Sequence, residues 1–153
     1  MISKRLFSAF SILACTLLSQ ISAAPKQPNI LLVMADDMGW TDLGCYGSEI
    51  ETPNLDSLAQ QGTLFTSFYT SVSCSPTRSM LLSGTDNHLA GLDNMGEMLQ
   101  PNQIGKPGYE GHLNDRVISL ADTLKQGGYH TYMAGKWHLG HDAGKYPADK
   151  GFD

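Results

Sequence analysis

Cys74 and Arg78 have side chains and a spacing that suit chemistry on an anion. They lie four positions apart with Pro76 between them, a spacing that puts both on one side of a helix. Exposed N–H groups at a helix N-terminus stabilise an anion, so a nucleophile at position 74 would be activated there. Arg78 would add a fixed positive charge. On these residues alone, a structural or disulfide-bonded cysteine beside a surface arginine is the favoured interpretation.

Asp36 and Asp37 are adjacent carboxylates that follow an apolar run. Carboxylate oxygens are preferred ligands of Ca²⁺ and Mg²⁺, and two neighbouring anions repel unless a positive group lies between them. The alternative is an aspartate pair in a solvated turn, favoured by Met38 and Gly39 behind it. The pattern supports both interpretations equally.

Lys136 and His138 are two positions apart and would point the same way from an extended segment. Lysine suits an oxyanion, and histidine transfers protons near neutral pH. A lone Lys-x-His pattern is weakly specific, and each of the remaining histidines also has an ordinary surface interpretation: His88, His112, His130 and His141.

These groups together describe a site for a tetrahedral oxyanion. The chain has a net charge of −5 and should repel an anionic substrate at long range, whereas Arg78, Lys136 and a divalent cation would reverse that field locally. The residues do not choose between sulfate and phosphate.

Composition excludes several classes of protein. Hydrophobic residues make up 41% of the 153 positions and charged residues 16%, which argues against a disordered chain. No apolar run reaches the roughly 20 residues of a membrane span. The acidic balance and the lack of a Lys/Arg cluster argue against binding of nucleic acid.

Helices and strands that would position these residues alternate along the chain. Residues 29–35 and 129–134 are predicted strands, and 64–69 is a weaker one. A helix is predicted at 53–61, with Thr52 as its cap, and another at 119–126. A short helix that ends at Gly84 is predicted between them. The Gly- and Asn-rich residues 85–116 are predicted to form a long loop.

This order indicates an α/β fold with a mainly parallel, mixed sheet flanked by helices. Ligands of such sheets bind outside the carboxyl ends of the strands. Asp36 and Asp37 follow the first predicted strand, and Lys136 and His138 follow the last.

The first 23 residues have the layout of a secretory signal peptide. Lys4 and Arg5 precede an apolar stretch at 6–18, and small residues lead to a cleavage site predicted after Ala23. A lipoprotein anchor through Cys15 is the less favoured alternative. We therefore expect a periplasmic or secreted protein whose mature part comprises residues 24–153. Removing both basic residues shifts the net charge from −5 to −7.

Export also makes a disulfide between Cys45 and Cys74 feasible.

Three blocks of the sequence, in order, closely resemble the type I sulfatases, formylglycine-dependent enzymes of the alkaline phosphatase-like superfamily. The blocks are PNILLVMADD at 28–37, CSPTRSMLLSG at 74–84 and GYHTYMAGKWHLG at 128–140. Residues 85–92 look most like those of bacterial arylsulfatases. The resemblance implies a sulfuric ester hydrolase with an alkaline phosphatase/sulfatase-like fold.

The resemblance also implies a role for each residue. Cys74 would be oxidised by a formylglycine-generating, sulfatase-maturating enzyme to an aldehyde, whose hydrate attacks sulfur and later expels sulfate. Asp36, Asp37 and the modified Cys74 would bind Ca²⁺, with Mg²⁺ as the alternative ion. Arg78 would hold the formylglycine, Lys136 would bind sulfate, and His138 would orient or deprotonate the hydrate. Cys45 would then stay free.

In that family, further metal ligands and a second lysine and histidine come from later in the chain. Residues 150–153 match a block inside the family domain, so we expect a domain incomplete at its C-terminus and a fragment inactive alone. The expected substrate is a small sulfate ester or a sulfated glycan. The alternatives are a phosphonate or phosphate monoester hydrolase of the same superfamily, or a non-catalytic binding protein.

Overall fold

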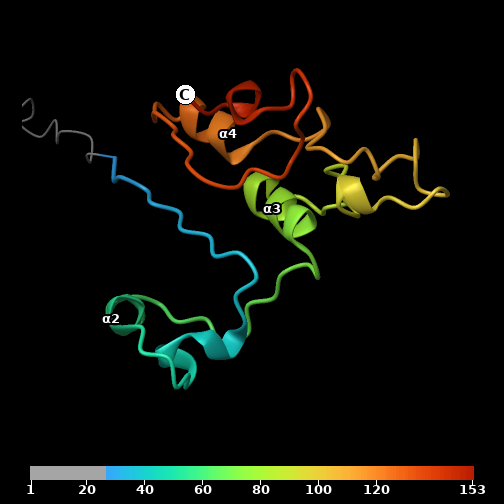
Figure 1. Ribbon diagram of the computed structural model, residues 1–153. Helices are drawn as coiled ribbons and strands as arrows, with labels where there is room; N and C mark the ends of the chain where they lie inside the picture. Colours follow the sequence, from blue (N-terminus) through green and yellow to red (C-terminus); the bar gives the residue numbers. More distant parts are fainter. Residues whose placement is uncertain (1–26) are drawn as a thin grey trace, which may run out of the picture. The chain divides into compact units, whose positions relative to one another are not determined.

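The computed structural model describes residues 27–153 (Figure 1). Among these residues, 27–34 belong to one unit and Ala35–Asp153 form a second. The predicted signal peptide and the alternative lipid anchor at Cys15 lie outside the described residues. Within 27–153, no helix is long and apolar enough to cross a membrane.

Helices and turns account for the regular structure of the second unit. The α-helices are α2 (Pro53–Gln61), α3 (Cys74–Ser83) and α4 (Leu120–Gln126). Short 3₁₀ helices are η1 (Trp40–Asp42), η2 (Gly44–Tyr46), η3 (Gly96–Met98) and η4 (Pro147–Lys150). The three α-helices confirm the helices predicted from the sequence, and α3 contacts α4.

Local chemistry explains where α3 and α4 begin and end. Gly84 ends α3 in the left-handed conformation, with φ of 63°, and its N–H donates to the Met80 carbonyl, as glycine does after many helices. Ser119 caps α4: its Oγ accepts the Asp122 N–H at 2.9 Å. The Ser119 hydroxyl also donates to the Lys150 carbonyl at 2.6 Å, which ties η4 to the start of α4.

Thr52 is the N-cap residue of α2, as predicted, but its side chain makes no capping hydrogen bond. Its Oγ1 accepts the Gly44 N–H at 2.8 Å, and its hydroxyl donates to Asp56 Oδ1 at 2.8 Å. Asp56 Oδ1 also accepts the Cys45 N–H at 2.7 Å. These bonds fasten η2 to the first turns of α2, because the Thr52 hydroxyl contacts both Gly44 of η2 and Asp56 of α2.

The strands of the expected sheet are absent from residues 27–153. The segments 29–35, 64–69 and 129–134 have no assigned strand structure. A strand exists through hydrogen bonds to a neighbouring strand, and none of the three segments has such a neighbour in the part of the chain described. The apolar side chains of the first segment are correspondingly uncovered, with Leu31 88% and Val33 76% exposed.

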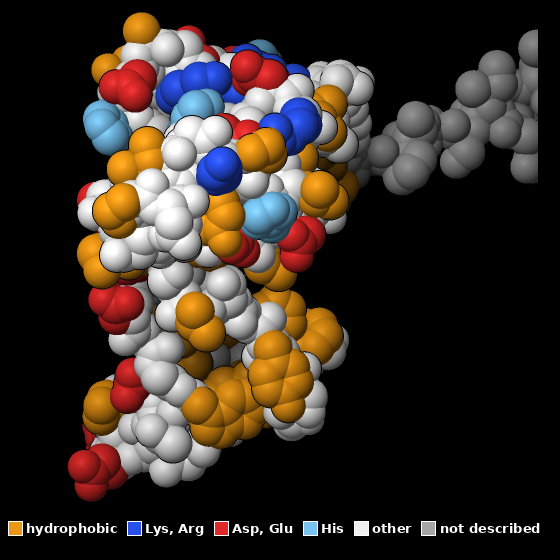
Figure 2. All heavy atoms as spheres, turned by 90° about the vertical axis from the view of Figure 1, so that its right-hand side faces the viewer, with side chains coloured by type: hydrophobic (Ala, Val, Ile, Leu, Met, Phe, Trp, Pro, Cys, Tyr) orange, Lys and Arg blue, Asp and Glu red, His pale blue; other side chains and the backbone are white. Residues whose placement is uncertain are grey.

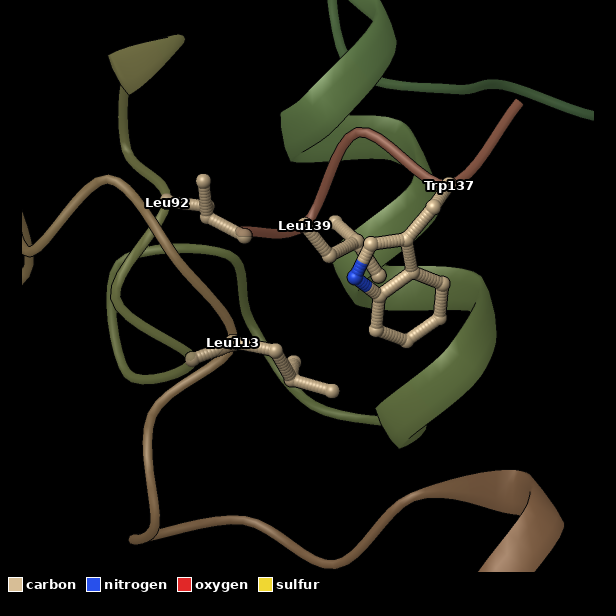
Figure 3. Packing of buried hydrophobic residues seen from close by; sticks show 5 residues of the cluster. Leu92, Leu113, Trp137 and Leu139 are labelled. Atoms are coloured by element: carbon tan, nitrogen blue, oxygen red, sulfur yellow. The ribbon is translucent and has the colours of Figure 1, made fainter. Parts of the chain in front are cut away.

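One apolar core lies beside α3 (Figure 3). Leu92 and Leu113, from the segment between α3 and α4, pack against Trp137 and Leu139, and all except Trp137 are fully buried. The Leu113 N–H donates to the Leu139 carbonyl at 2.9 Å. The segment that carries Lys136 and His138 is thus anchored by its two apolar neighbours.

Residues 85–116 form the predicted long loop, with η3 as its helical turn. The loop folds back on itself. The Gly111 N–H donates to the Gly91 carbonyl at 3.0 Å, and the Asp93 N–H donates to the Gly108 carbonyl at 2.9 Å. Asn114 reaches across it, because its Nδ2 donates to the Leu89 carbonyl at 2.9 Å. This bonding gives the loop a defined path despite its lack of longer helices.

Charged and apolar surface is unevenly distributed. Figure 2 shows the Lys, Arg and His side chains of this face in its upper part, whereas acidic and hydrophobic side chains occur in both parts, with a group of adjoining hydrophobic side chains in the lower part. Exposed apolar residues in α2 and in the segment that follows it in the sequence include Leu58, Phe65, Phe68 and Tyr69.

Candidate functional site

Arg78 joins two of the three sequence blocks to α3. Its Nη1 donates to the Lys136 carbonyl at 2.7 Å, and its Nη2 lies 3.3 Å from Asp36 Oδ1. The residue is only 8% exposed. Two residues that lie 58 and 42 positions away in the chain therefore meet one guanidinium, whose rigid fork suits two acceptors at fixed directions.

Lys136 and Asp36 form an ion pair beside that guanidinium, with Nζ 2.8 Å from Oδ2. The hydrogen bond from Lys136 is the largest influence lowering the pKa of Asp36, and Arg78 lowers it further. The pKa of Lys136 is raised, first by its hydrogen bond to Asp36 and also by charge and hydrogen bonding with Cys74. The interactions therefore link Asp36, Lys136 and Cys74.

Cys74 is the first residue of α3, at the position where backbone N–H groups are free. Its Sγ lies 3.4 Å from Met95 Sδ, which belongs to the loop before η3. Cys74 and Cys45 are both free thiols. The disulfide interpretation was therefore wrong: the Cys45 N–H binds Asp56 of α2, Cys74 begins α3, and neither thiol is bonded to the other.

His138 is held in an unusual backbone conformation, with φ of 58°. Its Nε2 lies 2.8 Å from Glu97 Oε1. Its Nδ1 is buried and has no hydrogen-bond partner among the described residues. Trp137, between Lys136 and His138, is in the core. The positive φ of His138 means that the segment is not extended there, so the alternation used in the sequence analysis does not apply at this residue.

Asp37 is exposed and has φ of 54°, a left-handed conformation that aspartate tolerates better than most residues. Asp36 therefore carries the contacts to Arg78 and Lys136, and Asp37 turns the chain next to it.

The fit of these residues to a calcium ion is partial. Two adjacent carboxylates have the right donor chemistry, but Ca²⁺ takes six to eight oxygens. Within residues 27–153 there is no group of three His, Cys, Asp or Glu side chains that could hold a metal ion. Asp36 and Asp37 can supply only part of a shell.

Glu97 and Met95 were missed by the sequence analysis. Both lie in a loop that was predicted only as a whole, and neither belongs to a block that suggested chemistry. The useful signal was the occurrence of a carboxylate in a Gly- and Asn-rich loop between two candidate blocks, although sequence spacing does not reveal that Glu97 meets His138.

A model of the Sulfatase family matches residues 28–153. The chain is 54% identical to an uncharacterized sulfatase of Schizosaccharomyces pombe, over 85% of this chain and 24% of that protein. It is 46% identical to an arylsulfatase of Klebsiella aerogenes, over 86% of this chain and 28% of that protein. It is 42% identical to the human N-acetylgalactosamine-6-sulfatase, over 86% of this chain and 26% of that protein. The chain thus spans about a quarter of the length of these relatives.

Two solved structures are also similar to this chain over about a quarter of their length. The crystal structure of Ps i-CgsB resembles this chain with a TM-score of 0.71 and 33% identity, over 84% of this chain and 27% of that one. The crystal structure of Ps i-CgsB in complex with k-i-k-neocarrahexaose resembles it with a TM-score of 0.71 and 32% identity, over the same shares of both chains.

Proposed function

The chain belongs to the sulfatase family, and from that membership we propose that the full-length protein hydrolyses sulfate esters. The observation that carries the proposal is the meeting of Asp36, Arg78 and Lys136 beside the first turn of α3. Two cations and a helix N-terminus lie together in a chain of net charge −5. Such a site attracts a tetrahedral oxyanion locally.

Cys74 is the proposed source of a formylglycine made by a sulfatase-maturating enzyme. When present, that group supplies a hydrated aldehyde as the nucleophile and lets sulfate leave as the aldehyde returns. Support comes from the free thiol at the start of α3 and from Arg78 one turn later. Arg78 keeps a buried Nε–H without an acceptor in the described residues, so it has a donor to offer an oxygen at position 74.

Lys136 and His138 would act on the substrate and on a proton. Lys136 Nζ is a positive charge on a 40%-exposed side chain, suited to bind a sulfate oxygen. His138 would take the proton of the attacking hydroxyl, because its Nδ1 has no other hydrogen-bond partner among the described residues.

Asp36 and Asp37 would hold Ca²⁺, or Mg²⁺, together with ligands from the rest of the protein. The ion would supply positive charge to the oxyanion. We further propose that residues 29–35, 64–69 and 129–134 become strands of a mixed, mainly parallel sheet when neighbouring strands of the full-length protein cover them. The exposed Leu31 and Val33 support this, because strands buried on both faces are rich in such residues.

The proposed substrate is an aryl sulfate or a sulfated sugar, in keeping with the names arylsulfatase and N-acetylgalactosamine-6-sulfatase among the relatives. We also propose export through the N-terminal signal, since lysine, arginine, an apolar stretch and small residues follow one another there.

Mass spectrometry of the peptide containing Cys74, from the exported full-length protein, tests the nucleophile. We expect the mass of an aldehyde in place of the thiol, and loss of both this mass and turnover in Cys74→Ala. Cys45→Ala is the matched control and should keep both. A fully active protein with an unmodified Cys74 contradicts the formylglycine proposal.

Turnover of matched aryl sulfate and aryl phosphate esters tests the reaction, because the charges of the site alone suit both anions. We expect the sulfate to be preferred, and a clear preference for phosphate overturns the assignment. Calcium should raise the melting temperature of the wild-type protein more than that of Asp36→Asn. Equal shifts would remove Asp36 from the metal site.

A further inference from the structure

Glu97 contacts a candidate catalytic residue that is distant in the sequence. Its Oε1 lies 2.8 Å from Nε2 of His138, across 41 positions of the chain. Glu97 is 58% exposed at its side chain, whereas His138 is 24% exposed. The carboxylate therefore approaches a partly covered imidazole from the solvent side.

The turn that carries Glu97 is fixed by its own bonds. Asn94 Nδ2 donates to the Met98 carbonyl at 3.0 Å, and Asn94 Oδ1 accepts the Met95 N–H at 2.9 Å. Gly96 lies so close to Gly111 that an added Cβ would meet the Gly111 carbonyl oxygen at 3.1 Å. Glu97 thus projects from a defined 3₁₀ turn and not from a loose loop tip.

The backbone of His138 is fixed as well. Trp137 and Leu139 on either side are buried in the core, and His138 has a positive φ. The remaining freedom of the imidazole is rotation about its side-chain bonds. The contact with Glu97 restricts that rotation, because a hydrogen bond requires one ring nitrogen to face the carboxylate.

The contact also selects a tautomer. The pKa of Glu97 is below its ordinary value, first because its own backbone N–H donates to the carboxylate and further because of His138. An ionised carboxylate only accepts hydrogen bonds. Nε2 must therefore carry the proton shared with Glu97, and in the neutral ring Nδ1 keeps the lone pair.

We propose that Glu97 is a positioning residue for His138: its carboxylate accepts the Nε2–H, fixes the ring and leaves Nδ1 as the nitrogen that accepts a proton during hydrolysis. The inference rests on the proposed function for the role of His138, but the contact and the tautomer do not depend on it. The loop 85–116 then contributes directly to the order of the site through η3.

Kinetics of the matured full-length protein test the role. Glu97→Gln keeps the size of the side chain, but its amide can donate as well as accept, so it no longer selects one tautomer. We expect kcat to fall by about tenfold, which is typical when a residue that orients a functional side chain by a hydrogen bond is replaced. KM should stay within about twofold of the wild-type value. Glu51→Gln, at an exposed glutamate, should leave both constants unchanged.

A double-variant comparison separates positioning from a general effect on the fold. In a His138→Ala background, Glu97→Gln should cost nothing further, because Glu97 then has no imidazole to orient. An equal loss of kcat in both backgrounds overturns the proposal, and so does an unchanged kcat in Glu97→Gln alone.

The ring-nitrogen chemical shifts of His138 provide a readout independent of activity. Wild type should show the Nε2–H tautomer, and Glu97→Gln a mixture of both. If the wild type hydrolyses no sulfate ester, the proposed function fails and the shifts alone decide the inference. A single Nε2–H tautomer in both proteins overturns the inference while leaving the proposed function intact.

Discussion

The guanidinium of Arg78 holds the backbone of Lys136, with Nη1 donating to the carbonyl oxygen across 2.7 Å. The Arg78 side chain is also paired with Asp36. Arg78 therefore fixes the main chain of Lys136, and the Lys136 ammonium binds the same aspartate. The position of the sulfate-binding candidate thus depends on a residue of α3.

Arg78→Lys should lower kcat/KM for a sulfate ester by about 10- to 100-fold, as expected when a positioning group is lost. The lysine ammonium is a point charge and lacks the planar fork that serves two acceptors. Arg116→Lys is the matched control, because Arg116 is 52% exposed at its side chain and pairs with Glu110 away from the site. Steady-state kinetics of the two variants measure the effect, and equal activities would remove Arg78 from the positioning of Lys136.

Leu139→Ala should destabilise the full-length protein by about 2–5 kcal/mol, the range for truncating a buried leucine. Leu139 is fully buried beside Trp137 and next to His138 in the chain. Leu89→Ala, at a 59%-exposed position, should change stability by less than about 0.5 kcal/mol. Urea unfolding measures both, and similar losses would contradict the central place of Leu139 in the core.

Gly140→Ala should cost more stability than Gly105→Ala, although both glycines have positive φ, of 121° and 73°. A Cβ at Gly140 would lie 2.8 Å from Lys145 Cβ and 2.9 Å from His112 Cβ, whereas Gly105 has nothing within 4 Å. The control therefore carries only backbone strain, of about 1–3 kcal/mol. Thermal unfolding of both variants makes the comparison, and a smaller loss for Gly140→Ala would count against the close packing there.

Asp115 should contribute stability at neutral pH that disappears in acid. Hydrogen bonding to Lys150 is the largest cause of its lowered pKa, and Lys145 adds to it. A carboxyl whose pKa is lower in the folded state stabilises the protein fully above its unfolded value, about pH 4, and stops doing so as pH falls through the folded value. Asp115→Asn should be less stable than wild type at pH 7.

The difference between Asp115→Asn and wild type should vanish well below pH 4. Urea midpoints across pH measure it, with Asp142→Asn as the control at an exposed aspartate. A difference that persists unchanged in acid would show that the ion pair with Lys150 is not its source.

Sequence patterns predicted the local elements well, because helix ends are written in nearby residues. Gly84 and Ser119 mark ends of α3 and α4 through bonds to residues at most four positions away. Strands depend on partners elsewhere, and the apolar run at 29–35 has none within the described residues. Its periodicity describes a preference for burial, which only neighbouring strands can satisfy.

The candidate site likewise combines residues that the sequence predicted with a contact that it did not. The blocks containing Asp36, Arg78 and Lys136 were expected to serve one site, and the structure brings these three residues together. The partner of His138 could not be predicted, because contact between Glu97 and His138 depends on the path of a loop whose turns leave no periodic pattern. Side chains that act through a loop of this kind are visible only in three dimensions.

The uncovered apolar segments also bear on how the chain behaves in solution. Residues 29–35 are a charge-free run with exposed leucine and valine, and residues 64–69 present exposed phenylalanine and tyrosine. Runs of this kind pair edge to edge between chains and seed aggregates. We expect these segments to promote association between copies of this chain wherever no neighbouring strand covers them.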